Sequence, residues 1–153
     1  MRNKLFLGTV AGFVGALVIA VFMLILKFFG IEVRVIPAIS QLFLIDSFIG
    51  TFEANAIGLL AHLICGSIIG AIFLLALEST GYNHWILKGA AMGSIVWFSL
   101  CGVVARLLEL SIRSNALNSL FNLIVHIIYG IVTAWFIFYF EGKAKSDNKL
   151  DVK

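Results

Sequence analysis

Charge, proline and cysteine are all scarce in this chain, and each shortage excludes a class of protein. Only 12% of the 153 residues are charged, one is proline, and 61% are hydrophobic. Soluble domains carry about 25% charged residues, so water is not the solvent for most of this surface. The two cysteines, Cys65 and Cys101, lie inside apolar stretches where a structural disulfide has no redox logic. We interpret both as small apolar fillers.

Sequence motifs of the common enzyme classes are also absent. The chain has no Walker motif, no dinucleotide-binding glycine pattern, no nucleophile elbow and no zinc-protease motif. Its net charge of +3 comes from basic residues at the ends of apolar stretches and in the C-terminal tail, not from a basic patch. We therefore predict that the protein is not an enzyme, binds no cofactor and has no nucleic-acid partner.

Four long windows almost free of charge predict membrane-spanning helices. A bilayer core of about 30 Å needs roughly 20 apolar residues in helical conformation. The windows predict helices over about 5–27, 53–77, 85–109 and 115–140. The expected fold is all-α: a polytopic membrane protein whose four transmembrane helices form one domain over 1–141, as two tandem hairpins in an up-down-up-down bundle.

The connections between these helices differ in character. Residues 38–49 are too few to span and too apolar to float free, so they predict a short interfacial segment. The connections near 79–84 and 110–113 are short, and the first predicts that helices two and three are antiparallel neighbours. Residues 142–153 have almost nothing to bury, so we predict a disordered cytoplasmic tail.

Lysine and arginine are distributed unevenly across the predicted membrane. The residues on the side of the two termini are Arg2, Lys4, Lys88, Lys143, Lys145, Lys149 and Lys153. Those on the opposite side are Lys27, Arg34, Arg106 and Arg113. The positive-inside rule then places both termini in the cytoplasm.

Helices two and four share a pattern that predicts an internal repeat. Segments 62–66 and 126–130 both begin with histidine and end with glycine, and a glutamate closes each helix. Segments 8–12 and 89–93 of helices one and three both begin and end with glycine. A duplicated hairpin explains both matches, as in parallel-repeat transporters, although glycines spaced by four also occur wherever membrane helices pack closely. The glycines predicted to pack helices together are Gly8, Gly12, Gly66, Gly70, Gly89, Gly93 and Gly130.

A few polar side chains inside the predicted membrane are the candidates for a site. Charged groups at a helix centre cost about 2.5–3.5 kcal/mol on insertion scales, and intramembrane polar groups therefore need a reason. The candidate residues are His62 on helix two and Asn118, Asn122 and His126 on helix four. Their spacing by four places them on stripes that also carry glycines, and we predict that both stripes face the bundle interior.

Two interpretations of these residues remain open. The functional one is a site centred on His62 and His126: bis-histidine haem ligands, a metal site completed by Cys65 or Cys101, or a proton relay. The other is hydrogen bonding between helices, worth roughly 0.6–2 kcal/mol for each bond. Without a paired carboxylate or a ligand cluster at zinc spacing, the sequence favours the second. We then expect the two imidazoles at the same depth, hydrogen-bonded directly or through one water.

At the far end of helix three, Arg106 and Glu109 stand three residues apart. On a helix that spacing places two side chains on one face, so we predict an interfacial ion pair.

A resemblance to a known family rests on three short strings. The string over 88–97 (Lys-Gly-x3-Gly-x3-Trp), with His62 before it and the string over 126–130 (His-x2-Tyr-Gly) after it, resembles an uncharacterised prokaryotic family of four-span membrane proteins. The chain is more distantly similar to the YqhR-type conserved membrane proteins. The resemblance covers roughly 54–138 and implies four helices in a bacterial or archaeal plasma membrane. It implies no activity.

Two functions follow from these features. Glycine stripes outnumber chemical groups, so the first hypothesis is a non-enzymatic scaffold or accessory subunit that acts by helix packing. Its partners would be the lipid bilayer and either a second copy or another membrane protein. The alternative is a protein that binds haem, a metal or a small solute around His62 and His126.

Overall fold

The structure, a computed structural model, describes residues 4–31, 34–110 and 116–142. All regular secondary structure in these ranges is helical. The elements are α1 (Lys4–Phe28), α2 (Val35–Ser40), η1 (Asp46–Phe48), α3 (Phe52–Thr80), α4 (Trp85–Val96), η2 (Trp97–Val104), α5 (Ala105–Leu107), α6 (Ala116–Ile137) and η3 (Phe138–Gly142). Apart from Gly142, the predicted disordered tail lies outside the described residues.

Four of the described helices are long and apolar enough to cross a membrane. They cover Lys4–Phe28, Phe52–Thr80, Trp85–Leu107 and Ala116–Glu141, where α4, η2 and α5 form the third and α6 continues into η3 for the fourth. The prediction of an all-α chain with four such helices is therefore confirmed. The predicted interfacial segment contains two shorter pieces, the end of α2 and η1.

Local chemistry explains where α3 begins and ends. Before its first turn, the side chain of Thr51 accepts a hydrogen bond from the Ala54 amide at 3.2 Å, which satisfies a donor that the helix cannot. Gly81 ends the helix with a φ of 83°, a conformation that glycine adopts without a steric penalty. The Lys88 ammonium then donates to the Gly81 carbonyl at 2.8 Å. The turn into α4 is thus held by side-chain contacts to backbone groups.

The predicted ion pair between Arg106 and Glu109 is not formed. The α-helix ends at Leu107, and Glu109 has a φ of 54°. The three-residue spacing aligns side chains only on a continuous helix. Because the chain leaves the helix between the two residues, they no longer share a face.

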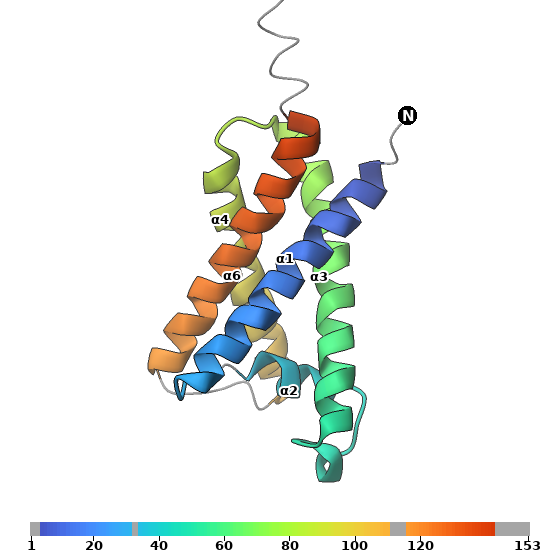
Figure 1. Ribbon diagram of the computed structural model, residues 1–153, viewed down its shortest axis with the longest axis vertical. Coiled ribbons are helices and arrows are strands. Elements are labelled where there is room, and N and C mark those ends of the chain that lie inside the picture. Colours follow the sequence, from blue (N-terminus) through green and yellow to red (C-terminus); the bar gives the residue numbers. More distant parts are fainter. Residues whose placement is uncertain (1–3, 32–33, 111–115, 143–153) are drawn as a thin grey trace, which may run out of the picture.

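The four long helices pack in the order α3, α1, α6, α4. The most extensive contacts join α1 to α3 and α4 to α6, and α1 and α6 form the central pair (Figure 1). The helices are antiparallel within the α1–α3 pair and within the α4–α6 pair. Lys4, at the start of α1, forms an ion pair with Glu78 near the end of α3. Likewise Trp85, at the start of α4, stacks on Phe138 of η3 with 5.4 Å between ring centroids.

Contact between α3 and α4 is sparse. The prediction that helices two and three pack as neighbours is therefore wrong.

Glycines decide which helices approach each other. A Cβ added to Gly12 of α1 would lie 2.8 Å from the Gly70 Cα of α3, and one added to Gly89 of α4 would lie 2.6 Å from the Gly130 carbonyl oxygen of α6. Only glycine allows backbones this close. The seven glycines that the sequence selected all lie at one of these two crossings or beside it: Gly8, Gly12, Gly66 and Gly70 between α1 and α3, and Gly89, Gly93 and Gly130 between α4 and α6.

The short helix α2 lies at the end of the molecule opposite the N-terminus (Figure 1). Its Pro37 falls in the first turn, where the backbone N–H that proline lacks would have no helical partner. It packs mainly against α3, where Gly58 leaves room for the Ile36 carbonyl. In this position α2 closes one end of the space between α3 and the α4–α6 pair.

Candidate functional site

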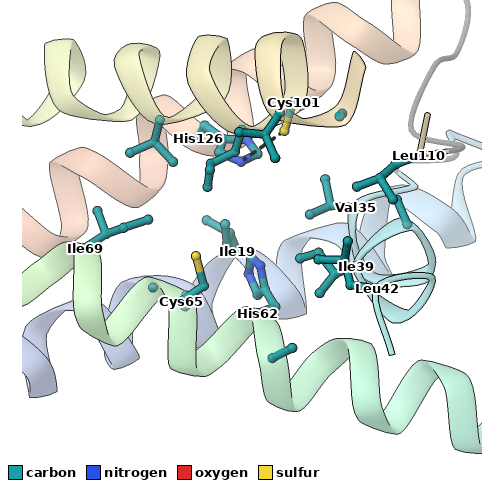
Figure 2. Close-up of a pocket in the computed structure, with 18 of the residues that line it drawn as sticks. Ile19, Val35, Ile39, Leu42, His62, Cys65, Ile69, Cys101, Leu110 and His126 are labelled. Carbon is teal, nitrogen blue, oxygen red and sulfur yellow. Dashed lines mark hydrogen bonds between the residues drawn. The ribbon is translucent and has the colours of Figure 1, made fainter. Parts of the chain in front are cut away.

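A cavity of about 230 Å³ lies in the space between α3 and η2 (Figure 2). The central helices α1 and α6 form its floor, and α2 closes one end. Its lining residues are Ala16, Ile19, Val35, Ala38, Ile39, Leu42, Phe43, Ala61, His62, Cys65, Gly66, Ile69, Val96, Leu100, Cys101, Val104, Ala105, Leu110, His126 and Tyr129. Most of these side chains are aliphatic, so the few polar groups among them carry the chemistry of the site.

His62 enters this cavity from α3, and its side chain is only 7% exposed. Its Nε2 atom has no hydrogen-bond partner in the part of the chain that the structure describes. The ring also lies beside the backbone of Ala16 in α1. In a neutral imidazole one nitrogen carries a hydrogen and the other accepts one, so Nε2 can serve a ligand in either role.

His126 enters from the opposite side, and both of its ring nitrogens have partners (Figure 2). Its Nδ1 donates to the Asn122 carbonyl, one turn earlier in α6, at 2.8 Å. In the neutral ring Nε2 is then an acceptor, and the Cys101 thiol of η2 lies 3.8 Å from it. Cys101 therefore links η2 to α6 as well as filling space.

No direct hydrogen bond joins the two imidazoles in the described part of the chain, and their pairing through one water stays a prediction. Both rings line the same cavity, but His126 is bonded to Asn122 and Cys101, and Nε2 of His62 has no partner among the described residues. A direct contact between the rings would need Gly66 and Gly130 to draw helices two and four together. Instead Gly66 meets α1 and Gly130 meets α4, so each histidine-bearing helix is drawn toward a different neighbour.

The predicted stripes do face the interior, although they do not all reach the cavity. Asn122 is 7% exposed, and its backbone carbonyl accepts the hydrogen bond from His126. Asn118 is half-buried and does not line the cavity. Among the described residues, no group of three or more His, Cys, Asp or Glu side chains is arranged to hold a metal ion. The two histidines and two cysteines therefore do not form a shared ligand set.

The sequence analysis did not select two features of the site, the Tyr129 side chain and a π-helix. Tyr129 crosses the floor of the cavity, and its hydroxyl donates to the Gly66 carbonyl at 2.7 Å, which ties α6 to α3. The third span also changes to π-helix over η2, where the Ala105 amide donates to the Leu100 carbonyl five residues earlier. Such segments often occur at functional sites. The only sequence signal was Tyr129, one turn after His126; nothing marked the π-helix.

Comparison with known proteins gives one match. A family described as "Family of unknown function (DUF6789)" matches residues 2–148. No curated protein and no solved structure matches the chain. The match fits the expected membership of an uncharacterised family, while the more distant resemblance to YqhR-type proteins stays a prediction.

Proposed function

From the premise that this chain belongs to the DUF6789 family, whose function is unknown, we propose that it is a non-enzymatic membrane protein that binds a small, largely apolar molecule between α3 and η2. The ligand carries one hydrogen-bond donor, which meets Nε2 of His62. The observation that carries this proposal is a histidine only 7% exposed, with an unpartnered nitrogen, in the wall of an apolar cavity.

Energetics favour an occupant at this nitrogen. A buried polar atom left without a hydrogen bond costs about 1–3 kcal/mol, and most such atoms in native proteins have a partner. An apolar residue at position 62 would avoid that cost. A ligand that donates to Nε2 removes the cost and gains the burial of its own apolar surface.

The cavity limits the size of the ligand. An engineered cavity of about 150 Å³ holds benzene, so 230 Å³ suits a molecule of roughly ten non-hydrogen atoms. This is below the roughly 300 Å³ at which pockets for drug-sized ligands begin. A space of 230 Å³ is too small to enclose a porphyrin, so the haem alternative is not favoured.

The scaffold hypothesis loses the observation that motivated it. It rested on glycine stripes that were expected to receive a partner. Those glycines are used within the chain, at the α1–α3 and α4–α6 crossings. Pairing with a second copy or another membrane protein stays a prediction.

The internal repeat also stays a prediction. In a duplicated hairpin, Gly12 of α1 would correspond to Gly93 of α4. Gly12 faces Gly66 and Gly70 of α3, whereas Gly93 faces His126 and Gly130 of α6, so the α1–α3 and α4–α6 crossings match only with an offset of one helical turn.

The proposed setting is the plasma membrane of a prokaryote, with an up-down-up-down topology and both termini in the cytoplasm. The orientation is supported by the excess of lysine and arginine on the side of the termini, seven against four of the 11 in the sequence. The pairing of Lys4 with Glu78, which joins the ends of α1 and α3, is consistent with this topology.

Cysteine labelling in intact cells tests this orientation. In a background without Cys65 and Cys101, a cysteine at Asn148 should react with an impermeant maleimide only after the cells are opened. A cysteine at Gln41, near the opposite end, should react in unbroken cells. The reverse pattern would overturn the orientation while leaving the cavity untouched.

The binding proposal predicts that the protein purifies with a bound compound. Organic extracts of the protein, purified in mild detergent from the membranes of its own cells, should contain one small apolar compound with a hydroxyl or N–H group at close to one copy per chain. Mass spectrometry measures it. Cys65→Phe fills the cavity and should abolish co-purification.

The matched control is Ile64→Phe, which adds a ring at the neighbouring, 52% exposed position outside the cavity. It should retain the compound. If no compound is enriched with the wild-type protein, or if both variants retain it equally, the cavity is not the binding site.

A further inference from the structure

The cavity beside His62 has an open side, between α3 and η2 (Figure 2). Neither α4 nor η2 makes extensive contact with α3, so the third span and α3 leave a gap between them. Three residues that line the cavity are also exposed at the surface of the protein, namely Leu42, Phe43 and Leu100. These side chains mark the mouth of the cavity.

Packed side chains close the other sides of the cavity. On its floor, the Tyr129 hydroxyl of α6 donates to the Gly66 carbonyl of α3. At the end covered by α2, Val35 is buried in a core cluster. Toward the opposite end, a second buried cluster joins Leu77 of α3 to Ile137 of α6. A ligand therefore has its most direct path through the mouth beside η2.

The rim of this mouth is apolar. Among the described residues that line the cavity, none is charged. Water in contact with leucine and phenylalanine side chains is unfavourable, whereas hydrocarbon accommodates them. His62 lies ten residues after the start of α3 at Phe52, about 15 Å along a helix of 29 residues. In the proposed membrane setting, this level is inside a hydrocarbon core of about 30 Å.

From the open side, the closed ends and the apolar rim, we infer that the ligand is an uncharged compound dissolved in the bilayer, which enters sideways between α3 and η2. A charged compound would lose its hydration without gaining an ionic partner in the cavity. The inference rests on the binding proposed at His62 and adds the class of the ligand and its route. Leu100 of η2, at the mouth, then controls the rate of passage.

Binding kinetics test the route. The full chain is reconstituted in liposomes, and stopped-flow fluorescence follows the association and dissociation of 2-naphthol. Leu100→Trp narrows the mouth, and the ligand has to displace the larger ring on entry and on exit. Both rate constants should therefore fall about ten-fold, while their ratio stays within about two-fold of the wild-type value.

Phe98→Trp is the matched control, because Phe98 lies on the same helix, is exposed and does not line the cavity. It should leave both rate constants unchanged. Unchanged rate constants in Leu100→Trp would place the entry elsewhere. A change in affinity with an unchanged association rate would show that Leu100 contacts the bound ligand and does not control its passage. Either result would overturn the inferred route.

A nitroxide at position 100 tests what surrounds the mouth without any ligand. The label is attached to Leu100→Cys in a background that carries Cys65→Ala and Cys101→Ala. Oxygen, which concentrates in hydrocarbon, should relax this label more strongly than a water-soluble nickel chelate does. At Glu109, which is exposed beyond the end of the same span, the order should be reversed. Stronger relaxation by nickel at position 100 would show that the mouth faces water, against the inference.

The outcomes distinguish this inference from the binding proposal. If 2-naphthol binds the wild-type protein and Leu100→Trp behaves like Phe98→Trp, the route is wrong and the site stands. If 2-naphthol does not bind the wild-type protein, the binding proposal fails and the inference fails with it, whatever the nitroxide shows. Circular dichroism of each variant establishes that it is folded before it is measured.

Discussion

Replacing Gly12 with leucine weakens the packing of α1 against α3 and destabilises the tertiary structure of the protein. A Cβ at this position would lie 2.8 Å from the Gly70 Cα, which belongs to a backbone that cannot rotate away as a side chain does. Overpacking a tight interior typically costs about 1–3 kcal/mol, and a leucine against backbone lies at the upper end of that range or beyond it. Titration with sodium dodecyl sulfate, followed by near-ultraviolet circular dichroism, should show an earlier transition.

Gly102→Leu is the matched control for this substitution. Gly102 belongs to the third span, and nothing lies within 4 Å of a Cβ built there. The same added side chain should therefore leave the midpoint unchanged. Far-ultraviolet signal should persist in both variants, because separated membrane helices remain helical. Equal midpoints for Gly12→Leu and wild type would contradict the packing described for α1 and α3.

Removing the imidazole of His62 abolishes discrimination between ligands with and without a hydrogen-bond donor. Suitable probes are 2-naphthol, which has one hydroxyl, and 2-methoxynaphthalene, which has a similar shape and no donor. Wild-type protein should prefer 2-naphthol by about ten-fold, the factor supplied by one hydrogen bond of about 1.4 kcal/mol. In His62→Leu the preference should fall to about one-fold, because the acceptor is gone. Equilibrium dialysis against matched micelles measures both affinities.

His84→Leu provides the control, since His84 lies in the connection before α4 and does not line the cavity. It should retain the full preference. A wild-type affinity for the methoxy compound equal to or above that for 2-naphthol would contradict the proposal that Nε2 accepts a hydrogen bond from the ligand. Equal affinities in wild type and His62→Leu would show that the imidazole contacts no ligand.

Much of the helical framework could be predicted from single segments of sequence. The four spans follow from windows almost free of charge, because a helix in hydrocarbon must satisfy its own backbone and expose apolar side chains. Most residues of the predicted stripes of helices two and four are buried, namely Gly58, His62, Gly66 and Gly70 on α3 and Asn122, His126, Gly130 and Ala134 on α6, whereas Asn118 is half-buried. A spacing of four residues repeats closely on one helix face, so burial follows from periodicity.

The candidate site was only half predicted, and the reason lies in the glycines. His62 and His126 were correctly selected as buried polar groups, but no direct hydrogen bond joins them. Gly66 faces α1 and Gly130 faces α4, and a glycine carries no side chain whose chemistry could have indicated its partner. The contact of Cys101 with His126 depends in addition on the π-helix, which shifts the register of η2 without any clear signal in its residues.

By itself, the sequence determined the number of apolar helices, the buried face of α3 and α6, and the polar groups placed inside. These are local properties, set by the length of each apolar run and by the period of a helix. The tertiary structure alone decided that α1 and α6 occupy the centre, that α3 and α4 stand apart, and that a cavity remains between α3 and η2. Those outcomes depend on the fit between backbones far apart in the chain. That fit leaves one nitrogen of His62 without a partner in the described part of the protein.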